Sequence, residues 1–362
     1  MHHSPHTRLL LAAAVALLGA IARQASAVDY LQIDPTGSPG NANYPVSGGF
    51  GAFGINDAGL VVGTNNFNGL LWSGGSMLGI RVVDGVNGVR YSEASGIANS
   101  AGGGTIVGSY ADNNWGRHGF VLTGWSPSGF DPGLGLPAIT GTFTLLDVPG
   151  ATFTGASGIN DSQIIVGNTL DPRTGGNGGF VFNGSGYTIF GIAGANSTEA
   201  SDVNNANVVV GTYHDNAGYH GYVAALAGIS GDQIATFTTI DVPVSGTQIT
   251  HLTGINDAGD LTGWYQDAGG RQHGFFMAGG AFTGLDYSGL NPANFLFRDT
   301  LAFGVNASDE VVGQTAESVN FNGVIGGHAF LATGLAVPEP GTLTLALLLV
   351  PAALAARRRP SR

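Results

Sequence analysis

The chain has 362 residues and no cysteine, which excludes a disulfide framework, thiolate chemistry and a cysteine-based metal site. Residues 28–336 contain six arginines, no lysine and 23 acidic residues, a formal charge of −17 that repels phosphate backbones and disfavours nucleic-acid binding. Glycine accounts for 62 residues, but a hydrophobic content of 43% can form a core, so the sequence predicts a folded protein.

The N-terminus is predicted to be a secretory signal peptide. Arg8 precedes an apolar run over residues 9–21, and Ala25 and Ala27 form a small-x-small cleavage site. This order of a basic start, a short apolar segment and small residues is typical of signal peptides, and a buried helix is the alternative. We expect residues 1–27 to engage the Sec export machinery and to be cleaved after Ala27.

The body contains about six copies of a ten-residue motif, most clearly at residues 54–63 and 254–263, where both begin Gly-Ile-Asn-Asp-Ala-Gly. The copies align on Ile55, Ile97, Ile159, Val203, Ile255 and Val305. A closing glycine follows eight residues later in five copies and eleven later in the second. Because Asn, Asp and Gly accept the positive φ of tight turns, each copy predicts a β-hairpin, and the recurrence predicts a modular β array.

A third strand with an aromatic step follows most hairpins. The steps are His118-Gly119-Phe120, Gly179-Phe180, His220-Gly221-Tyr222, His273-Gly274-Phe275 and His328-Ala329-Phe330, with Leu70-Leu71-Trp72 in the first unit. Fourth strands are predicted at residues 77–84, 143–149, 187–192, 237–243 and 282–287. Together with the Gly-Ile-Asn-Asp turns, the His-Gly-Phe steps resemble the HAF family of extracellular repeats over most of residues 50–332.

Four strands per unit of 40–60 residues predict an all-β fold, a six-bladed β-propeller over residues 28–336. Seven blades or another β-repeat array is the alternative. The sixth unit lacks a fourth strand, and residues 29–35 match that strand's pattern, so we expect the N-terminal segment to pair with residues 327–331 and close the ring. The glycine before each Ile is expected where the innermost strands converge, because a side chain would collide there.

The C-terminus is predicted to be a sorting signal. Pro338-Glu339-Pro340 precedes an apolar run over residues 343–356 and the cluster Arg357-Arg358-Arg359. The run is short for a membrane span, but the arginines fit the positive-inside rule. Residues 337–362 resemble a PEP-CTERM signal. The resemblance implies transient inner-membrane anchoring through a short helix, recognition by an exosortase in a Gram-negative envelope, and delivery to the cell surface or exopolysaccharide matrix. A plain membrane anchor is the alternative.

The sequence predicts no catalytic, cofactor or metal site. His118, His220, His273 and His328 recur at one blade position, and we interpret them as structural ties between strands, because equivalent positions lie far apart around a ring. Asp57, Asp161 and Asp257 are interpreted as turn formers. His214 and His251 fall outside the repeat without a nearby nucleophile. The loops beginning at Asp112, Asp171 and Asp215 are rich in oxygen donors, which leaves weak Ca²⁺ binding open.

These patterns favour a non-enzymatic, exported surface or matrix protein that contacts neutral or acidic polysaccharide. Aromatic residues near loops, such as Trp115, Tyr219 and Trp264, are interpreted as packing residues, with stacking on sugar rings as the alternative. A glycan hydrolase or lyase with its site at the channel mouth is the rival hypothesis, since a fold does not determine function. A purely structural spacer is the third.

Overall fold

The computed structural model describes residues 28–33, 50–65, 67–99, 103–131, 136–173, 175–247, 249–287, 298–318 and 325–335. Within these ranges the regular structure is β, apart from one 3₁₀ turn, η1 (Leu226–Gly228), so the predicted all-β class is confirmed. The predicted signal peptide and sorting signal lie outside these ranges. None of the helical structure that is described could reach across a membrane.

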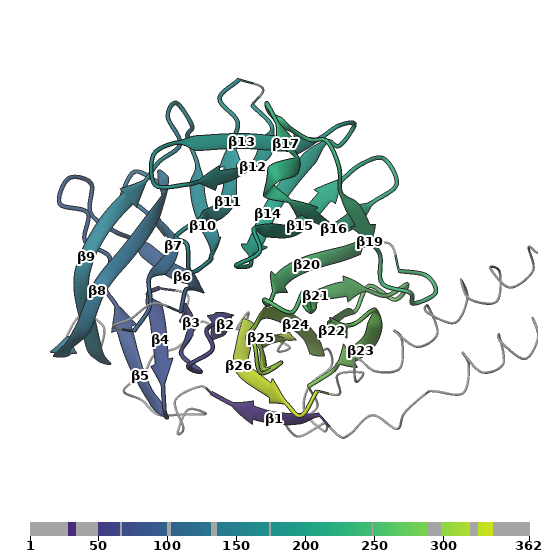
Figure 1. The fold of residues 1–362 in the computed structure, drawn as a ribbon. Helices are drawn as coiled ribbons and strands as arrows, with labels where there is room; N and C mark the ends of the chain where they lie inside the picture. Colours follow the sequence, from purple (N-terminus) through teal and green to yellow (C-terminus); the bar gives the residue numbers. More distant parts are fainter. Residues whose placement is uncertain are drawn as a thin grey trace, which may run out of the picture.

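The strands form six successive units that correspond to the predicted repeats (Figure 1). Units 1 to 3 comprise β2 (Gly51–Ile55), β3 (Val61–Thr64), β4 (Gly69–Ser73) and β5 (Ser76–Ile80); β6 (Tyr91–Ile97), β7 (Ile106–Ala111), β8 (Arg117–Asp131) and β9 (Leu136–Leu146); and β10 (Thr154–Ile159), β11 (Ile165–Leu170), β12 (Asn177–Phe182) and β13 (Tyr187–Ile192). Units 4 to 6 comprise β14 (Ser197–Val203), β15 (Val208–His214), β16 (Tyr219–Ala225) and β19 (Thr238–Ile240); β20 (Ile249–Ile255), β21 (Leu261–Gln266), β22 (Gln272–Ala278) and β23 (Ala281–Leu285); and β24 (Arg298–Val305), β25 (Val311–Ser318), β26 (Ile325–Thr333) and β1 (Asp29–Gln32).

The first strands of the six units lie around a common axis (Figure 1). A Cβ atom placed on Gly54 would lie 2.7 Å from the Ser95 carbonyl oxygen of unit 2, and one on Gly304 would lie 2.9 Å from the Phe53 carbonyl oxygen of unit 1. The sixth unit therefore contacts the first and the array closes on itself. These approaches confirm that glycine precedes the apolar residue because neighbouring backbones leave no room for a side chain.

The N-terminal segment completes the last unit. β1 runs antiparallel to β26, with Leu31 opposite Leu331 and Gln32 opposite Phe330, and the Ile33 N–H donates to the Ala329 carbonyl at 3.1 Å. The predicted pairing with residues 327–331 is thus confirmed. It covers the edge of β26, which would otherwise present unpaired backbone groups to other chains.

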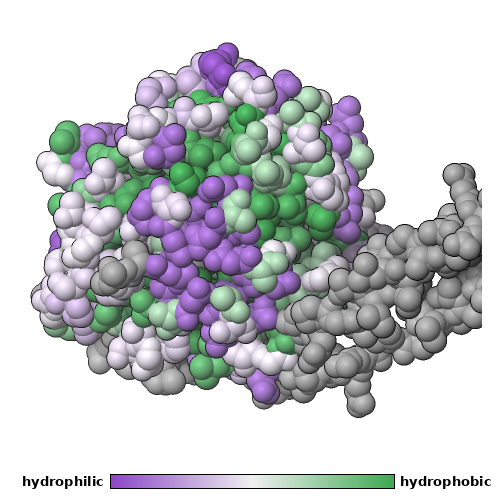
Figure 2. All heavy atoms as spheres, in the orientation of Figure 1, coloured by the Kyte–Doolittle hydropathy of each residue, from purple (hydrophilic) through white to green (hydrophobic). Residues whose placement is uncertain are grey.

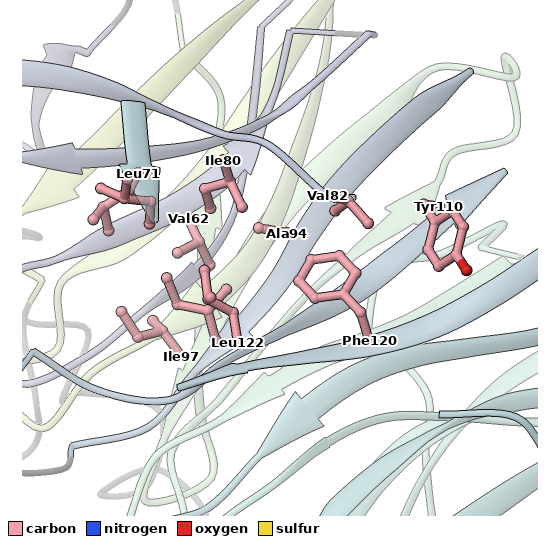
Figure 3. Packing of buried hydrophobic residues seen from close by; sticks show 11 residues of the cluster. Val62, Leu71, Ile80, Val82, Ala94, Ile97, Tyr110, Phe120 and Leu122 are labelled. Atoms are coloured by element: carbon pink, nitrogen blue, oxygen red, sulfur yellow. The ribbon is translucent and has the colours of Figure 1, made fainter. Parts of the chain in front are cut away.

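The hydrophobic core lies between neighbouring units rather than in one central mass. Between units 1 and 2, Leu71 of β4 and Ile80 of β5 pack against Phe120 and Leu122 of β8, all completely buried (Figure 3). Similar clusters are found between other neighbouring units. Each sheet is therefore buried on both faces, which explains why its strands lack a simple alternation of polar and apolar residues.

Two hairpins that the repeat pattern did not predict extend neighbouring sheets. The outer part of β8 and β9 reaches unit 1, where residues 138–139 pair in parallel with β5. The small hairpin of β17 (Ile229–Ser230) and β18 (Gln233–Ile234) pairs with β13 of unit 3 in the same way. Each attachment carries an ion pair, Arg81–Asp131 at 2.8 Å and Arg173–Asp232 at 3.2 Å. Both hairpins cover sheet edges.

The fourth strand predicted at residues 187–192 is confirmed as β13, but the other four predicted fourth strands were too long at their C-terminal ends. β9 ends at Leu146, β19 at Ile240 and β23 at Leu285, so the aspartate that follows each strand lies outside it. Two of these segments continue to a proline, which lacks the N–H that a ladder requires. The aspartates instead hydrogen-bond histidines of the third strands.

Candidate binding site along the ring axis

The asparagine of each Gly-Ile-Asn-Asp turn binds its own turn and the next unit. In unit 1, Asn56 Oδ1 accepts hydrogen bonds from the N–H groups of Ala58 and Leu60 at 3.1 and 3.0 Å, which fixes the turn. Its Nδ2 donates to the Ala98 carbonyl of unit 2 at 3.5 Å. The equivalent bonds between later units are Asn160–Asn204 (3.0 Å), Asn204–Asn256 (3.1 Å), Asn256–Asn306 (3.2 Å) and Asn306–Asn56 (3.3 Å). Unit 2 has Ala98 at this position, and because alanine has no side-chain amide, this bond is absent between units 2 and 3.

The residue that comes directly after the turn asparagine forms a second set of contacts between units. It is occupied in turn by Asp57, Asn99, Asp161, Asn205, Asp257 and Ala307. The backbone N–H of this residue donates to the side-chain Oδ1 of the next one at 2.7–2.8 Å, in five of the six steps. We call these two sets the asparagine–aspartate ring. The aspartates are thus not simply turn formers, as interpreted from the sequence, because their carboxylates join one unit to the next. Hydrophilic side chains gather at the centre of the face in Figure 2.

At the other end of the axis lies a cavity of about 250 Å³, on the side of the close glycine contacts away from the asparagine–aspartate ring. We call the position of Gly54 and its equivalents in the other units the close-contact position. The lining of the cavity includes Glu93 and, from every unit, the residue directly before that position: Phe53, Ser95, Ser157, Ser201, Thr253 and Phe303. We call it the hydroxyl cavity. The rings of Phe53 and Phe303 meet edge to face with centroids 5.1 Å apart, so one wall is aromatic, and most of the other lining residues carry hydroxyl groups. These residues were not predicted from the sequence as site residues, although they occupy the same position in the aligned repeats.

Two glutamates lie one step further out, two residues before Ser95 and Ser201 on the same strand faces. Glu93 forms an ion pair with Arg117 at 3.3 Å and accepts a hydrogen bond from Ser109 Oγ at 2.8 Å. The Glu199 carboxylate has no such partner among the described residues, and burial raises its pKa above the usual range. Glu93 lines the hydroxyl cavity and Glu199 is not among its lining residues, and the two carboxyl groups have different electrostatic surroundings.

Four aromatic rings from units 4 and 5 form a stack next to this end of the axis. His214 stacks on Tyr219 with centroids 4.3 Å apart, Tyr219 on His251 at 5.4 Å, and His251 on Trp264 at 4.1 Å. We call this the aromatic stack. His251 lies two residues before Thr253 of the hydroxyl cavity, and burial lowers its pKa to about 4, so the imidazole is neutral at physiological pH. Trp115, by contrast, is 67% exposed and stacks under the Arg90 guanidinium at 4.1 Å.

The recurrent histidines tie the third strand to the segments on either side, as the sequence predicted. His273 Nδ1 lies 2.9 Å from Asp286, after β23, and its Nε2 lies 3.1 Å from Asp267, in the loop before β22. His220 has the same two partners, Asp241 at 2.9 Å and Asp215 at 3.4 Å, whereas His118 lies 3.0 Å from Asp147 but 3.7 Å from Asp112, beyond hydrogen-bond distance. His328 in unit 6 instead contacts Gln32 of β1 at 3.1 Å. Each histidine is bound by residues of its own unit and lies away from the residues along the axis.

The oxygen-rich loops hold their carboxylates with hydrogen bonds from their own backbones. Asp112 Oδ1 accepts from the N–H groups of Asn114 and Gly116 at 2.8 and 2.7 Å, and Asp171 is paired with Arg173 at 2.7 Å. Across the described ranges, no three His, Asp or Glu side chains are grouped so that they could hold a metal ion. The predicted sorting and cleavage residues, Pro338–Pro340, Arg357–Arg359, Ala25 and Ala27, lie outside those ranges.

Two solved structures resemble the chain in outline. They are AofleA from Arthrobotrys oligospora, with a TM-score of 0.43, and a triple arginine-to-alanine mutant of the same protein, with a TM-score of 0.44. Each is 10% identical in sequence, and each match covers 86% of this chain and 94% of the other. No protein-family model and no curated protein sequence matches the chain.

Proposed function

We propose that the chain is a six-bladed β-propeller that is exported, sorted to the cell surface or exopolysaccharide matrix, and binds polysaccharide there without catalysing a reaction. The six units, the contact of the sixth with the first, and the completion of the last sheet by β1 support the propeller architecture. The turns and histidine steps that resemble the HAF repeats coincide with the contacts within and between units.

The address signals support the export part of this proposal. An N-terminal signal peptide over residues 1–27 would direct the chain through the inner membrane, and the PEP-CTERM-like tail over residues 337–362 would anchor it until an exosortase processes it. Replacing Pro338, Glu339 and Pro340 by alanine should retain the chain in the inner-membrane fraction. The Trp115→Ala variant, which leaves the signal intact, should reach the surface like the wild type. Equal release of both variants would contradict the sorting role.

The hydroxyl cavity is the observation that carries the binding part. Ligand sites combine apolar surface with a few convergent polar groups, and this cavity joins the Phe53–Phe303 wall to hydroxyls contributed by four different units. Amphipathic sugars present both a C–H face and hydroxyl groups to such a surface. The aromatic stack next to it adds further ring surface.

The test is retention of the full-length chain, purified in mild detergent, on immobilised neutral and acidic polysaccharides. We expect retention on at least one class, with the bound polysaccharide unchanged in length after incubation. Failure to bind every polysaccharide and every cell-surface fraction would contradict the proposal.

A glycan hydrolase or lyase is the second candidate, and Glu93 and Glu199 favour it. Glycosidases use two carboxyl groups in different environments, one of them held protonated, and burial raises the pKa of Glu199 whereas Glu93 is paired with Arg117. Shortening of an oligosaccharide by the wild type but not by Glu199→Gln would support an enzyme and exclude the purely binding role.

A further inference from the structure

We propose that the hydroxyl cavity receives the terminal residue of a neutral hexose chain, end-on along the ring axis; this inference rests on the proposed polysaccharide-binding function. Its volume of about 250 Å³ is below the roughly 300–1,000 Å³ of pockets for drug-sized ligands, so it accommodates a group the size of one sugar ring.

The position of the cavity selects a chain end. Its walls come from the first strands of all six units, so it is enclosed laterally. Inward, the axis continues as a cavity of about 80 Å³ that reaches the asparagine–aspartate ring, about a third of the volume of the hydroxyl cavity and too small for a second sugar ring. An internal segment of a polysaccharide would need both of its neighbours to leave through the same opening. A terminal residue needs only one exit.

The surface chemistry of the cavity matches a hexose ring. Phe53 and Phe303, which contact each other from units 1 and 6, offer an apolar surface for the C–H face of the sugar. The Ser95 hydroxyl of unit 2, next to Phe53, and the Ser201 hydroxyl of unit 4, across the cavity, make no hydrogen bonds within the described residues and are available to sugar hydroxyls. A hydroxyl both donates and accepts, so it pairs with another hydroxyl in either orientation.

The charges at the opening select against acidic sugars. Arg117 lies near this end, and its charge is compensated by Glu93. Among the described residues no cation is paired with Glu199, which lies on the strand face of Ser201, so a uronate carboxylate near it would meet negative potential. A neutral hexose avoids this repulsion, and the Glu199 carboxylate can accept a hydrogen bond from it.

The aromatic stack is placed to continue the site beyond the cavity. His251 lies two residues outward from Thr253 on one face of β20, and Trp264 stacks on it from β21. The register partner of Trp264 on β22 is Gly274, so no side chain of that strand flanks the indole at this position. The second sugar residue of an end-bound chain would pass along this surface.

The first test is competition on the full-length chain bound to polysaccharide. We expect methyl glycosides of neutral hexoses to displace it at millimolar concentration and methyl uronosides to fail. Linear oligosaccharides of the competing hexose should bind, whereas cyclic oligosaccharides of the same hexose, which have no end, should bind at least about tenfold more weakly. Equal binding of the cyclic compounds, or stronger competition by uronosides, would overturn the inference.

The second test uses matched variants. Ser201→Leu fills the cavity and should weaken binding of the linear oligosaccharide at least about tenfold, whereas Ser185→Leu, in an exposed turn of unit 3, should leave binding unchanged. Thermal unfolding checks that both variants fold, and Ser95→Leu provides a second cavity filling from another unit. If polysaccharides bind wild type and all variants equally, the cavity assignment is wrong while the binding function stands. If wild type binds no polysaccharide, the proposed function itself fails.

Discussion

Asn205 of unit 4 is joined to Asp257 of unit 5 by two hydrogen bonds. Its backbone N–H donates to Asp257 Oδ1 and its side-chain Nδ2 donates to Oδ2, both at 2.8 Å. Asn205 Nδ2 also donates to Asp161 Oδ2 of unit 3 at 2.7 Å, so one amide bridges two carboxylates. Alternating asparagine with aspartate places a donor between like charges. This arrangement lets acidic residues converge at the axis without direct carboxylate contacts.

The asparagine–aspartate ring is open at Ala307, which accepts no hydrogen bond from the Asp257 N–H through its side chain. We expect Ala307→Asn to stabilise the protein by about 0.5–1.5 kcal/mol, the net value of a typical hydrogen bond, because an amide there can pair with both Asp257 and Asp57. Urea denaturation measures the change. Ala307→Leu is the control, and an equal gain with leucine would contradict the hydrogen-bond explanation.

Asp202 occupies the close-contact position that is glycine in the other five units. Burial raises its pKa to about 7, although its oxygens accept hydrogen bonds from Val203 and Ile255 N–H at 2.8 and 3.1 Å. A carboxyl group with a raised pKa holds its proton longer in the folded state. Its contribution to the free energy of unfolding therefore falls as pH rises from about 4 to about 7.

We expect this loss to be on the order of 2 kcal/mol between pH 5 and pH 8, because one pKa unit corresponds to about 1.4 kcal/mol. Asp202→Asn should lower stability at both pH values by removing one acceptor, but it should also remove this part of the pH dependence. Denaturant titrations of both proteins at the two pH values give the comparison. A variant with the wild-type pH dependence would exclude Asp202 as its source.

Gly254 lies where units 5 and 6 approach most closely, and a Cβ atom there would be 2.4 Å from the Phe303 carbonyl oxygen. Backbone cannot move aside as a flexible side chain does, so Gly254→Ala should destabilise the protein by about 1–3 kcal/mol. Gly186→Ala, at an exposed site with nothing within 4 Å, is the matched control and should change the melting temperature little. Similar melting temperatures for both variants would mean that the units can separate at no cost.

Leu31 pairs with Leu331 through its backbone while its side chain is 53% exposed. Because hydrogen-bonded pairs alternate in an antiparallel ladder and Ile33 N–H donates to Ala329, the Leu31 N–H belongs to the bonded set. Leu31→Pro should remove this bond and cost about 1–3 kcal/mol. Leu31→Ala keeps the bond and should cost far less. If chemical denaturation finds equal losses, strand pairing is not what β1 contributes.

The sequence by itself allowed the strand borrowed from the N-terminus to be predicted, because the last repeat lacks its own fourth strand. It also determined the local structure: the period of the repeat, the hairpins and the histidine ties. These depend on turn chemistry and on strand register over a few residues, which a single chain segment already encodes. It also allowed the glycine approaches to be predicted, because no other residue type suits a backbone contact.

Only the tertiary structure decided which residues of different repeats contact each other. Phe53 and Phe303 are 250 residues apart in the chain but meet because the ring closes, and His214, Tyr219, His251 and Trp264 stack because two units adjoin. The aspartates after Asn56, Asn160 and Asn256 also bind neighbouring units. The local sequence around them is that of an ordinary turn, so it could not predict these contacts. Contacts between units depend on how the sheets are placed around the axis, and that placement is set by packing across their faces.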